Sequence, residues 1–144
     1  AKAIVEARKN IKIKSTKELA EILLEEVPRS FNDKKHPATK TFQAIRIFIN
    51  NELEELELLL DFISKHLKIG GRACIISFHS LEDRMVKRFF RDHSRRDPRL
   101  SKLPNLADDS SFKLVSKAIK PSDEEINLNP RSRSAVLRVV ERIK

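Results

Sequence analysis

Residues 70–90, GGRACIISFHSLEDRMVKRFF, constrain the fold more than any other stretch of the chain. A Gly-Gly turn leads into an apolar run at 73–78, and a polar elbow at 77–80 starts an amphipathic helix. An apolar run without alternation is typical of a parallel strand covered on both faces. Ligands of open α/β sheets bind just beyond the carboxyl ends of such strands. We therefore expect an α/β fold in which His79 and Ser80 lie at a ligand-facing edge.

The composition excludes several classes of protein. The chain has 144 residues, 40% hydrophobic and 35% charged, which is enough for one domain with a core. No apolar run approaches the roughly 20 residues of a membrane helix, so we predict no membrane partner. The single cysteine, Cys74, suits a reducing cytoplasm and is expected to be a small buried hydrophobe. The net charge of +9 favours nucleic acid as a partner, although solvated lysine-rich faces explain it equally well.

The glycine count limits what the chain can bind. Its two glycines are both in the Gly70-Gly71 turn. Loops that wrap a dinucleotide, ATP or S-adenosylmethionine need several glycines after a strand, for tight turns and close backbone approach. We therefore expect no such loop in this chain. The chain also begins without Met and already in helical rhythm at 1–8, which we interpret as a start inside a larger protein.

The first half of the chain is predicted to be helical. Ser15 and Glu18 form a capping box, so a helix is expected to run to about Glu26. Pro37 suits the first turn of a long helix, from 39 to 67. A core stripe at spacings of three and four runs along it, through Phe42, Ile45, Ile49, Leu53, Leu56, Leu60, Ile63 and Leu67. Residues 29–36 are predicted to form a basic loop.

The second half alternates between strands and loops. A surface loop is expected at 94–111, a strand at 112–119 and a short helical turn from 121–125. A basic loop at 129–134 precedes the final strand, 135–143, in which Arg138 and Arg142 face one way.

Three segments together resemble one protein family. They are HPATKTFQAIR at 36–46, ISFHSLEDR at 76–84 with the VKRF that follows, and NPRSRSA at 129–135 with Leu137-Arg138. In this order they closely resemble the bacterial ribosomal RNA small subunit methyltransferase H family, RsmH or MraW. The resemblance covers nearly the whole chain and is weakest at 94–111. It implies S-adenosylmethionine-dependent methylation of N4 of a cytidine in 16S rRNA, with the small ribosomal subunit as partner.

The resemblance also implies an architecture. Family members have a class I, Rossmann-like methyltransferase core with a helical insert, and their cofactor loop lies in the first half. On this reading residues 1–38 end the insert domain and residues 39–144 form the C-terminal part of the core. Strands at 72–78, 112–119 and 135–143 would be the fifth, sixth and seventh of the core, with the last antiparallel. The missing N-terminal half becomes a partner, and this chain alone is expected to be inactive.

The elbow residues are open to two interpretations. His79 and Ser80 could face the cofactor or a base extruded from its stack. Alternatively, Ser80 could cap the following helix, with Glu82 and Asp83 favouring its N-terminal dipole. A serine hydrolase is excluded, because adjacent residues on one elbow cannot form a nucleophile–base pair. The scattered histidines and Cys74 lack metal-ligand spacing, so no metal is expected. No catalytic residue is assigned, because methylation of an amine depends mainly on positioning.

Basic residues supply the candidate RNA contacts. Lys40, Gln43 and Arg46 share a helix face that could meet a phosphate or a base edge, or could be solvated or form salt bridges to the insert. Arg131 and Arg133 flank Ser132 in a loop suited to phosphate, with a salt bridge to acidic residues 123–125 as the alternative. The cations of the helix after the elbow are expected to form a solvated face; they are Arg84, Lys87, Arg88 and Arg91.

Rival functions remain at this point. One is a non-catalytic basic RNA-binding module, and another, with little support, is a helical adaptor that binds protein through residues 52–57. A homodimer is left open, and the expected location is the cytoplasm.

Overall fold

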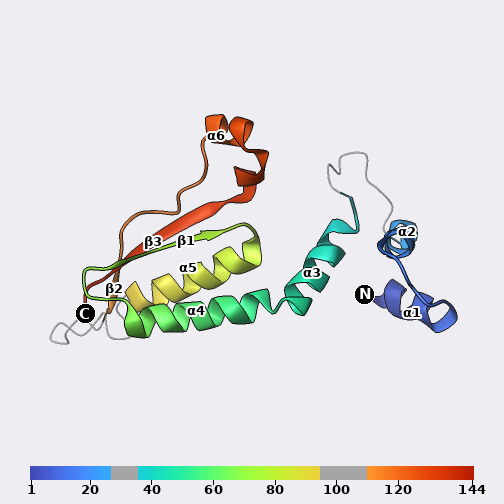
Figure 1. Cartoon of the computed structure of the whole chain (residues 1–144), viewed down its shortest axis with the longest axis horizontal. Helices are drawn as coiled ribbons and strands as arrows, with labels where there is room; N and C mark the ends of the chain where they lie inside the picture. Colours follow the sequence, from blue (N-terminus) through green and yellow to red (C-terminus); the bar gives the residue numbers. More distant parts are fainter. Residues whose placement is uncertain (27–35, 95–109) are drawn as a thin grey trace, which may run out of the picture. The chain divides into compact units, whose positions relative to one another are not determined.

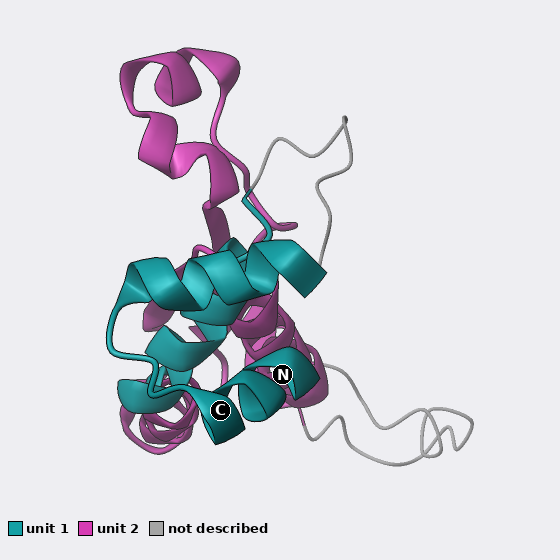
Figure 2. Cartoon of the chain, turned by 90° about the vertical axis from the view of Figure 1, so that its right-hand side faces the viewer, with its two compact units in different colours: residues 1–52 teal, residues 53–144 magenta. Residues whose placement is uncertain are grey.

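The computed structural model describes residues 1–26, 36–94 and 110–144. The chain divides into two compact units, residues 1–52 and 53–144, which are described separately (Figure 2). The elements in order are α1 (Lys2–Asn10), α2 (Thr16–Glu26), α3 (Thr39–Ile49), α4 (Glu52–His66), β1 (Arg72–Ser77), α5 (Ser80–Ser94), β2 (Phe112–Leu114), α6 (Asp123–Leu128), the 3-10 helix η1 (Pro130–Ser134) and β3 (Val136–Arg142) (Figure 1). This mixture of helices and strands confirms the α/β class. Across the described ranges, no helix combines the length and apolarity needed to cross a bilayer.

The predicted capping box starts α2. The Oγ of Ser15 accepts a hydrogen bond from the amide of Glu18 at 3.2 Å, and Oε2 of Glu18 accepts from the amide of Ser15 at 3.4 Å. The same carboxylate oxygen accepts from the amide of Lys14 at 2.7 Å. Three amide groups at this end are thus satisfied locally, which is why the helix begins here. Leu23 is the buried residue of α2, and α1 packs beside α2.

The predicted long helix is wrong, because the chain forms two helices. α3 ends at Ile49, and Asn51 adopts a positive φ of 50° before α4 begins. Asparagine tolerates this left-handed conformation better than other residues with a side chain, so the Asn50-Asn51 pair ends the helix. The core stripe is correspondingly interrupted. Leu60 on α4 is 3% exposed, whereas Ile49 on α3 is 70% exposed.

The sheet has three strands in the order β1-β3-β2. β3 is antiparallel to both neighbours, which confirms the predicted direction of the last strand. Its register pairs Ala73 with Val140 and Ser77 with Val136. The predicted strand at 112–119 is only partly correct, because β2 ends at Leu114 and pairing resumes as a single bridge between Ile119 and Leu137.

The core of the second unit lies between α5 and one face of this sheet (Figure 1). Val86 and Phe90 from α5 meet Phe112 from β2 and Val140 from β3, and each is at most 1% exposed. Full burial of side chains of this size contributes roughly 1.5 to 3 kcal/mol each. Partly buried residues of α4 and α5, and the residue that follows α4, extend this core; they are Leu56, Ile63, Leu67, Met85 and Phe89.

The opposite face of the sheet corrects two predictions. β1 alternates, with Ala73 and Ser77 buried and Cys74 and Ile76 exposed. Among the described residues, only one face of β1 is covered. The described strand that pairs with β1 is β3, which runs antiparallel to it, whereas a parallel neighbour was predicted. Cys74 is exposed because it points away from α5, so the prediction of a buried cysteine is wrong.

The Gly70-Gly71 turn ties the end of α4 to the sheet. Gly70 has a φ of 79°, and its amide donates to the carbonyl of Arg142 at 2.7 Å. A Cβ on Gly71 would lie 2.8 Å from the carbonyl oxygen of Lys68, so both positions require glycine. Nη1 of Arg142 donates to the carbonyl of Leu67 at 2.8 Å, which joins β3 to the same turn.

The remaining sequence predictions have mixed outcomes. The helical turn from 121–125 is confirmed as α6, with Ser122 as its N-cap. The predicted loop at 129–134 is instead the 3-10 helix η1. Nearly all of the predicted loops at 29–36 and 94–111 lie outside the described residues. The domain boundary after residue 38 stays a prediction.

Candidate functional site at the carboxyl edge of β1

Two of the three sequence motifs meet at one edge of the sheet. β1 ends at Ser77, which pairs with Val136 at the start of β3. The elbow therefore leaves the sheet where η1 enters it, and α6 lies beyond the same edge (Figure 1). The Oγ of Ser77 donates to the carbonyl of Val136 at 3.4 Å, which links the two segments directly. The candidate site is formed by the elbow and η1.

A reciprocal cap holds the elbow in shape. Oε2 of Glu82 accepts hydrogen bonds from the amides of Phe78 and His79, at 2.9 and 3.3 Å. In return, Nδ1 of His79 accepts from the amide of Glu82 at 3.3 Å. This is a capping box in which histidine takes the place of serine or threonine. Two successive amides of the elbow are thereby occupied by a side chain of the same helix.

The cap determines what His79 can do. Its carbonyl accepts from the amide of Asp83 at 3.1 Å, so His79 is the N-cap residue of α5. With Nδ1 as acceptor, the proton of the neutral ring is assigned to Nε2, which lies 3.2 Å from Oε1 of Glu82. The side chain is 9% exposed. The capping role that the sequence suggested for Ser80 is thus taken by His79, and Ser80 is exposed in the first turn.

An ion pair between Arg138 and Asp83 fixes the helix that follows the elbow to the sheet. Nε and Nη2 of Arg138 donate to the two carboxylate oxygens of Asp83 at 2.7 and 3.0 Å. This fork joins β3 to α5, and the side chains are only 18% and 25% exposed. The hydrogen bond from Arg138 holds the pKa of Asp83 below its ordinary value, against an opposing effect of burial. The Oγ of Ser77 lies 3.5 Å from the same carboxylate.

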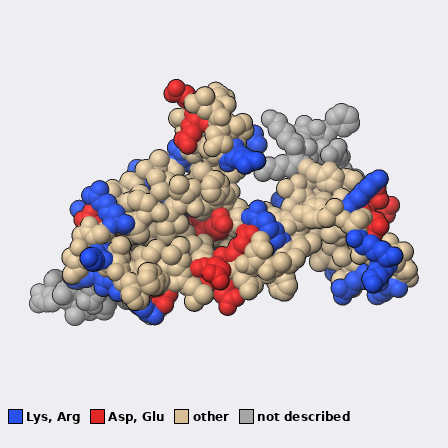
Figure 3. All heavy atoms as spheres, viewed as in Figure 1, with Lys and Arg blue, Asp and Glu red and all other residues tan. Residues whose placement is uncertain are grey.

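On the other side of the edge, η1 presents two arginines. Asn129 accepts from the amide of Arg131 through its side chain at 3.2 Å, and its carbonyl accepts from Oγ of the buried Ser132 at 2.8 Å. The inward Ser132 leaves Arg131 and Arg133 exposed on either side. Within the described ranges, neither guanidinium forms an ion pair, so the predicted alternative of a salt bridge to residues 123–125 is not seen. In the space-filling view, both acidic and basic side chains are exposed on the part of the chain that contains α6 and η1 (Figure 3).

The third motif lies in the first unit. Lys40 is exposed and Gln43 half-buried on α3. Arg46 forms a fork with Glu52, with Nε 2.7 Å from Oε1 and Nη2 3.0 Å from Oε2. An ion pair was one of the alternatives for Arg46, but the partner observed among the described residues is Glu52, which lies outside the expected insert at 1–38. The solvated face predicted for α5 is observed, because Arg84, Lys87, Arg88 and Arg91 are all exposed.

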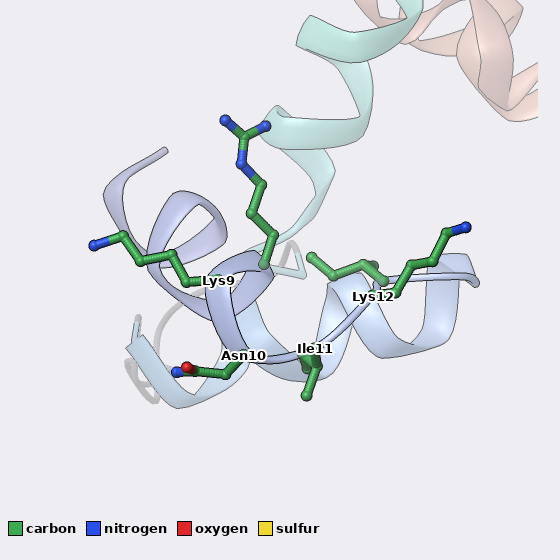
Figure 4. Close-up of a pocket in the computed structure, with 6 residues that line it drawn as sticks. Lys9, Asn10, Ile11 and Lys12 are labelled. Carbon is green, nitrogen blue, oxygen red and sulfur yellow. The ribbon is translucent and has the colours of Figure 1, made fainter.

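Two hollows are lined by other residues. One, of about 420 Å³, is lined by residues 8–13 at the end of α1, where the side chains of Lys9 and Lys12 extend in opposite directions (Figure 4). The other, of about 330 Å³, lies between α4 and α5 and includes Asp61 and His93. Asp61 is paired with Lys65 at 2.7 Å, and Nδ1 of His93 donates to the carbonyl of Phe89 at 2.9 Å. Neither hollow contains a predicted site residue.

Sequence reasoning missed the supporting residues of the elbow. Glu82 and Asp83 were expected only to favour the helix dipole, and Arg138 was given a direction without a partner. The spacing of three between His79 and Glu82 is the signal for the cap, once histidine is admitted as an acceptor. The pairing of Asp83 with Arg138 spans 55 residues and has no local signal.

Comparisons with known proteins agree with the motifs. The chain is 52% identical to "Ribosomal RNA small subunit methyltransferase H" of Aromatoleum aromaticum over 99% of its length, which is 46% of that protein. It is 50% identical to the proteins of the same name from Coxiella burnetii and Marinomonas sp., again over 99% of this chain. It spans about half the length of these curated relatives. A family model described as the MraW methylase family matches residues 1–143, and the chain belongs to this family.

Proposed function

We propose that this chain is the C-terminal part of an enzyme that methylates N4 of a cytidine in 16S rRNA, with S-adenosylmethionine as methyl donor. The observation that carries the proposal is the meeting of the elbow and η1 at one edge of the sheet. Two segments that are separated by about fifty residues in sequence, and that carry the family resemblance, are adjacent there. The names of the relatives support an RNA substrate.

The proposed fold is the end of a class I methyltransferase core, with part of a helical insert before it. Strands β1, β2 and β3 would be its fifth, sixth and seventh strands, with β3 as the antiparallel one. Cys74 and Ile76 form an exposed apolar row on the sheet face opposite α5. We propose that the remaining part of the domain covers this row and pairs with β1, since apolar strand faces are normally buried.

We propose that the described residues supply only part of a cofactor site. A sulfonium nucleotide needs close backbone approach and free amides, and the two glycines of the chain lie in the turn before β1. The elbow amides of Phe78 and His79 are occupied by Glu82. We therefore propose that the main cofactor contacts lie in the remaining part of the protein. Calorimetry with S-adenosylmethionine should show no binding by this chain alone, and saturable binding would overturn this placement.

The role proposed for this chain is to hold RNA and to position the base. Arg131 and Arg133 are exposed and carry planar forks that match phosphate geometry. Lys40 and Gln43 are proposed as further RNA contacts from α3. Arg46 is committed to Glu52 and would contact RNA only by changing partners. Because the exocyclic amine is a weak nucleophile, rate should depend on alignment more than on a general base.

The alternative is a basic RNA-binding module without catalysis. The net charge of +9 and the exposed arginines suit it equally well. The two functions differ in one observable, methyl transfer. We further propose a cytoplasmic location, where small ribosomal subunits are assembled, and leave self-association to be measured by sedimentation.

Methyl transfer can be tested by exchange of the matching half of a relative. The 144 residues would replace the region that they match in the protein of Aromatoleum aromaticum, to which they are 52% identical. The substrate is small ribosomal subunits from cells that lack the relative, and the readout is tritiated methyl groups in 16S rRNA. Incorporation is expected. A chimaera that binds S-adenosylmethionine and RNA but transfers no methyl group would favour the non-catalytic alternative.

A further inference from the structure

We infer that Phe78 is a stacking surface for an unpaired base of the RNA that binds at the carboxyl edge of β1. This rests on the proposed function and names the residue that reads the flat face of a nucleotide. Phe78 follows the last residue of β1 and is 55% exposed. Exposed aromatic rings are not unusual in themselves, and Phe62 is equally open, so the inference depends on the position of Phe78 at the carboxyl end of β1.

Hydrogen bonds made by Phe78 and by the residues before and after it fix the backbone at this position. Its amide donates to Oε2 of Glu82 at 2.9 Å, and the next residue, His79, caps α5. The preceding residue, Ser77, is 3% exposed and donates to the carbonyl of Val136. The ring is therefore displayed from a fixed elbow. Rigid display suits a stacking surface, because little conformational freedom is lost when a flat ligand binds.

The neighbouring charges indicate what kind of ligand this is. Arg131 and Arg133 lie on η1 at the same edge, exposed and without ion pairs among the described residues. An aromatic ring for the base beside guanidinium forks for the phosphates is the combination that holds single-stranded nucleic acid. A base extruded from its stack presents two faces that need such a surface. The ring and the arginines together therefore favour a single-stranded segment over a duplex.

The rival explanation is that another part of the protein packs on Phe78. The exposed apolar row of Cys74 and Ile76 runs along β1 toward it, so a covering layer could extend this far. The two explanations predict opposite responses to substitution. A packed site tolerates Phe78→Leu better than the larger Phe78→Trp, whereas a stacking surface retains function with tryptophan and loses it with leucine.

The composition of the chain provides a direct probe. It contains no Trp and no Tyr, so Phe78→Trp introduces a single emitting side chain. Phe62→Trp on α4 is the matched control, since Phe62 is 57% exposed. A cytidine-containing single-stranded RNA of about ten nucleotides would be titrated into each variant. We expect saturable quenching for Phe78→Trp and none for Phe62→Trp.

Binding by Phe78→Leu completes the test. We expect about tenfold weaker binding with an unchanged dependence on salt, because an uncharged contact is lost. Unchanged emission from Phe78→Trp while RNA binds, or wild-type binding by Phe78→Leu, would overturn the role of Phe78 and leave the proposed function intact. Failure of the unmodified chain to bind RNA at low salt would instead count against the proposed RNA contact itself.

Discussion

The guanidinium of Arg138 on β3 donates two hydrogen bonds, of 2.7 and 3.0 Å, to the carboxylate of Asp83 on α5. The pair crosses from the strand that follows η1 to the helix that follows the elbow. Both halves of the candidate site are therefore fixed to one another by a contact that is only partly open to solvent. Forks of this kind are directional, and losing one partner leaves the other charge poorly solvated.

Asp83→Asn should lower the free energy of unfolding by about 1 to 2 kcal/mol, because it leaves the guanidinium of Arg138 without its counter-charge. The matched control is Asp92→Asn on the same helix, where Asp92 meets Arg91 at 2.8 Å and both side chains are at least half exposed. That change should cost much less stability, because an ion pair open to solvent contributes little. Urea denaturation of both variants measures the difference. Equal losses would show that the buried fork adds nothing beyond a surface pair.

The same pair predicts how stability depends on pH. Arg138 lowers the pKa of Asp83 below its ordinary value of 3.8, so the folded state favours the ionised carboxylate. The resulting stabilisation is fully present above that ordinary value and is lost as the pH falls through the lowered pKa of the folded state. Stability should therefore fall more steeply below about pH 4 in the original chain than in Asp83→Asn. Parallel curves from urea denaturation at pH 2.5 to 5 would refute this coupling.

If His79 acts only as the N-cap of α5, another residue with a side-chain hydrogen-bond acceptor should be able to replace it. His79→Asn keeps a side-chain acceptor at the N-cap and should retain stability to within about 0.5 kcal/mol, whereas His79→Ala should lose about 1 kcal/mol. Methyl transfer by a chimaera with His79→Asn should likewise persist. Full stability combined with loss of transfer in His79→Asn would instead assign the ring a chemical role.

The stability of the chain should depend on how easily residue 51 adopts a positive φ. Its φ of 50° is accessible to asparagine and glycine, while a residue such as alanine pays a steric cost there. We expect Asn51→Ala to destabilise by about 0.5 to 1 kcal/mol and Asn51→Gly to be neutral or slightly stabilising. Thermal unfolding of the two variants makes the comparison at one position. Equal stability would mean that the break between α3 and α4 does not depend on this residue.

Local patterns predicted most of the elements, and the errors have physical causes. The Ser15–Glu18 box and the Ser122 cap have short-range signals, so the starts of α2 and α6 could be anticipated. A period of three and four continues through Asn50 and Asn51, which is why the break between α3 and α4 went unnoticed. The exposed Cys74 was missed because an apolar run does not say which of its faces has a covering layer.

The candidate site was less predictable than the fold. The sequence placed His79 and Ser80 at a strand end and set Arg131 and Arg133 in a separate segment. That these segments share an edge depends on the pairing of Ser77 with Val136, a contact between residues far apart in the chain. The support from Arg138 is equally non-local. Non-local contacts leave no periodic trace in a single sequence, so they emerged only from the fold.

The most direct test of the account is the salt dependence of RNA binding by the double variant Arg131→Ala plus Arg133→Ala. A matched control on the solvated face of α5 is Arg84→Ala plus Arg88→Ala, which removes the same charge. Each phosphate contact on a single strand contributes about 0.7 to the slope of log K against log salt. The account predicts a slope smaller by about 1.4 for the η1 variant and little change for the α5 control. Equal slopes for the original chain and the η1 variant would contradict the claim that this edge of the sheet faces RNA.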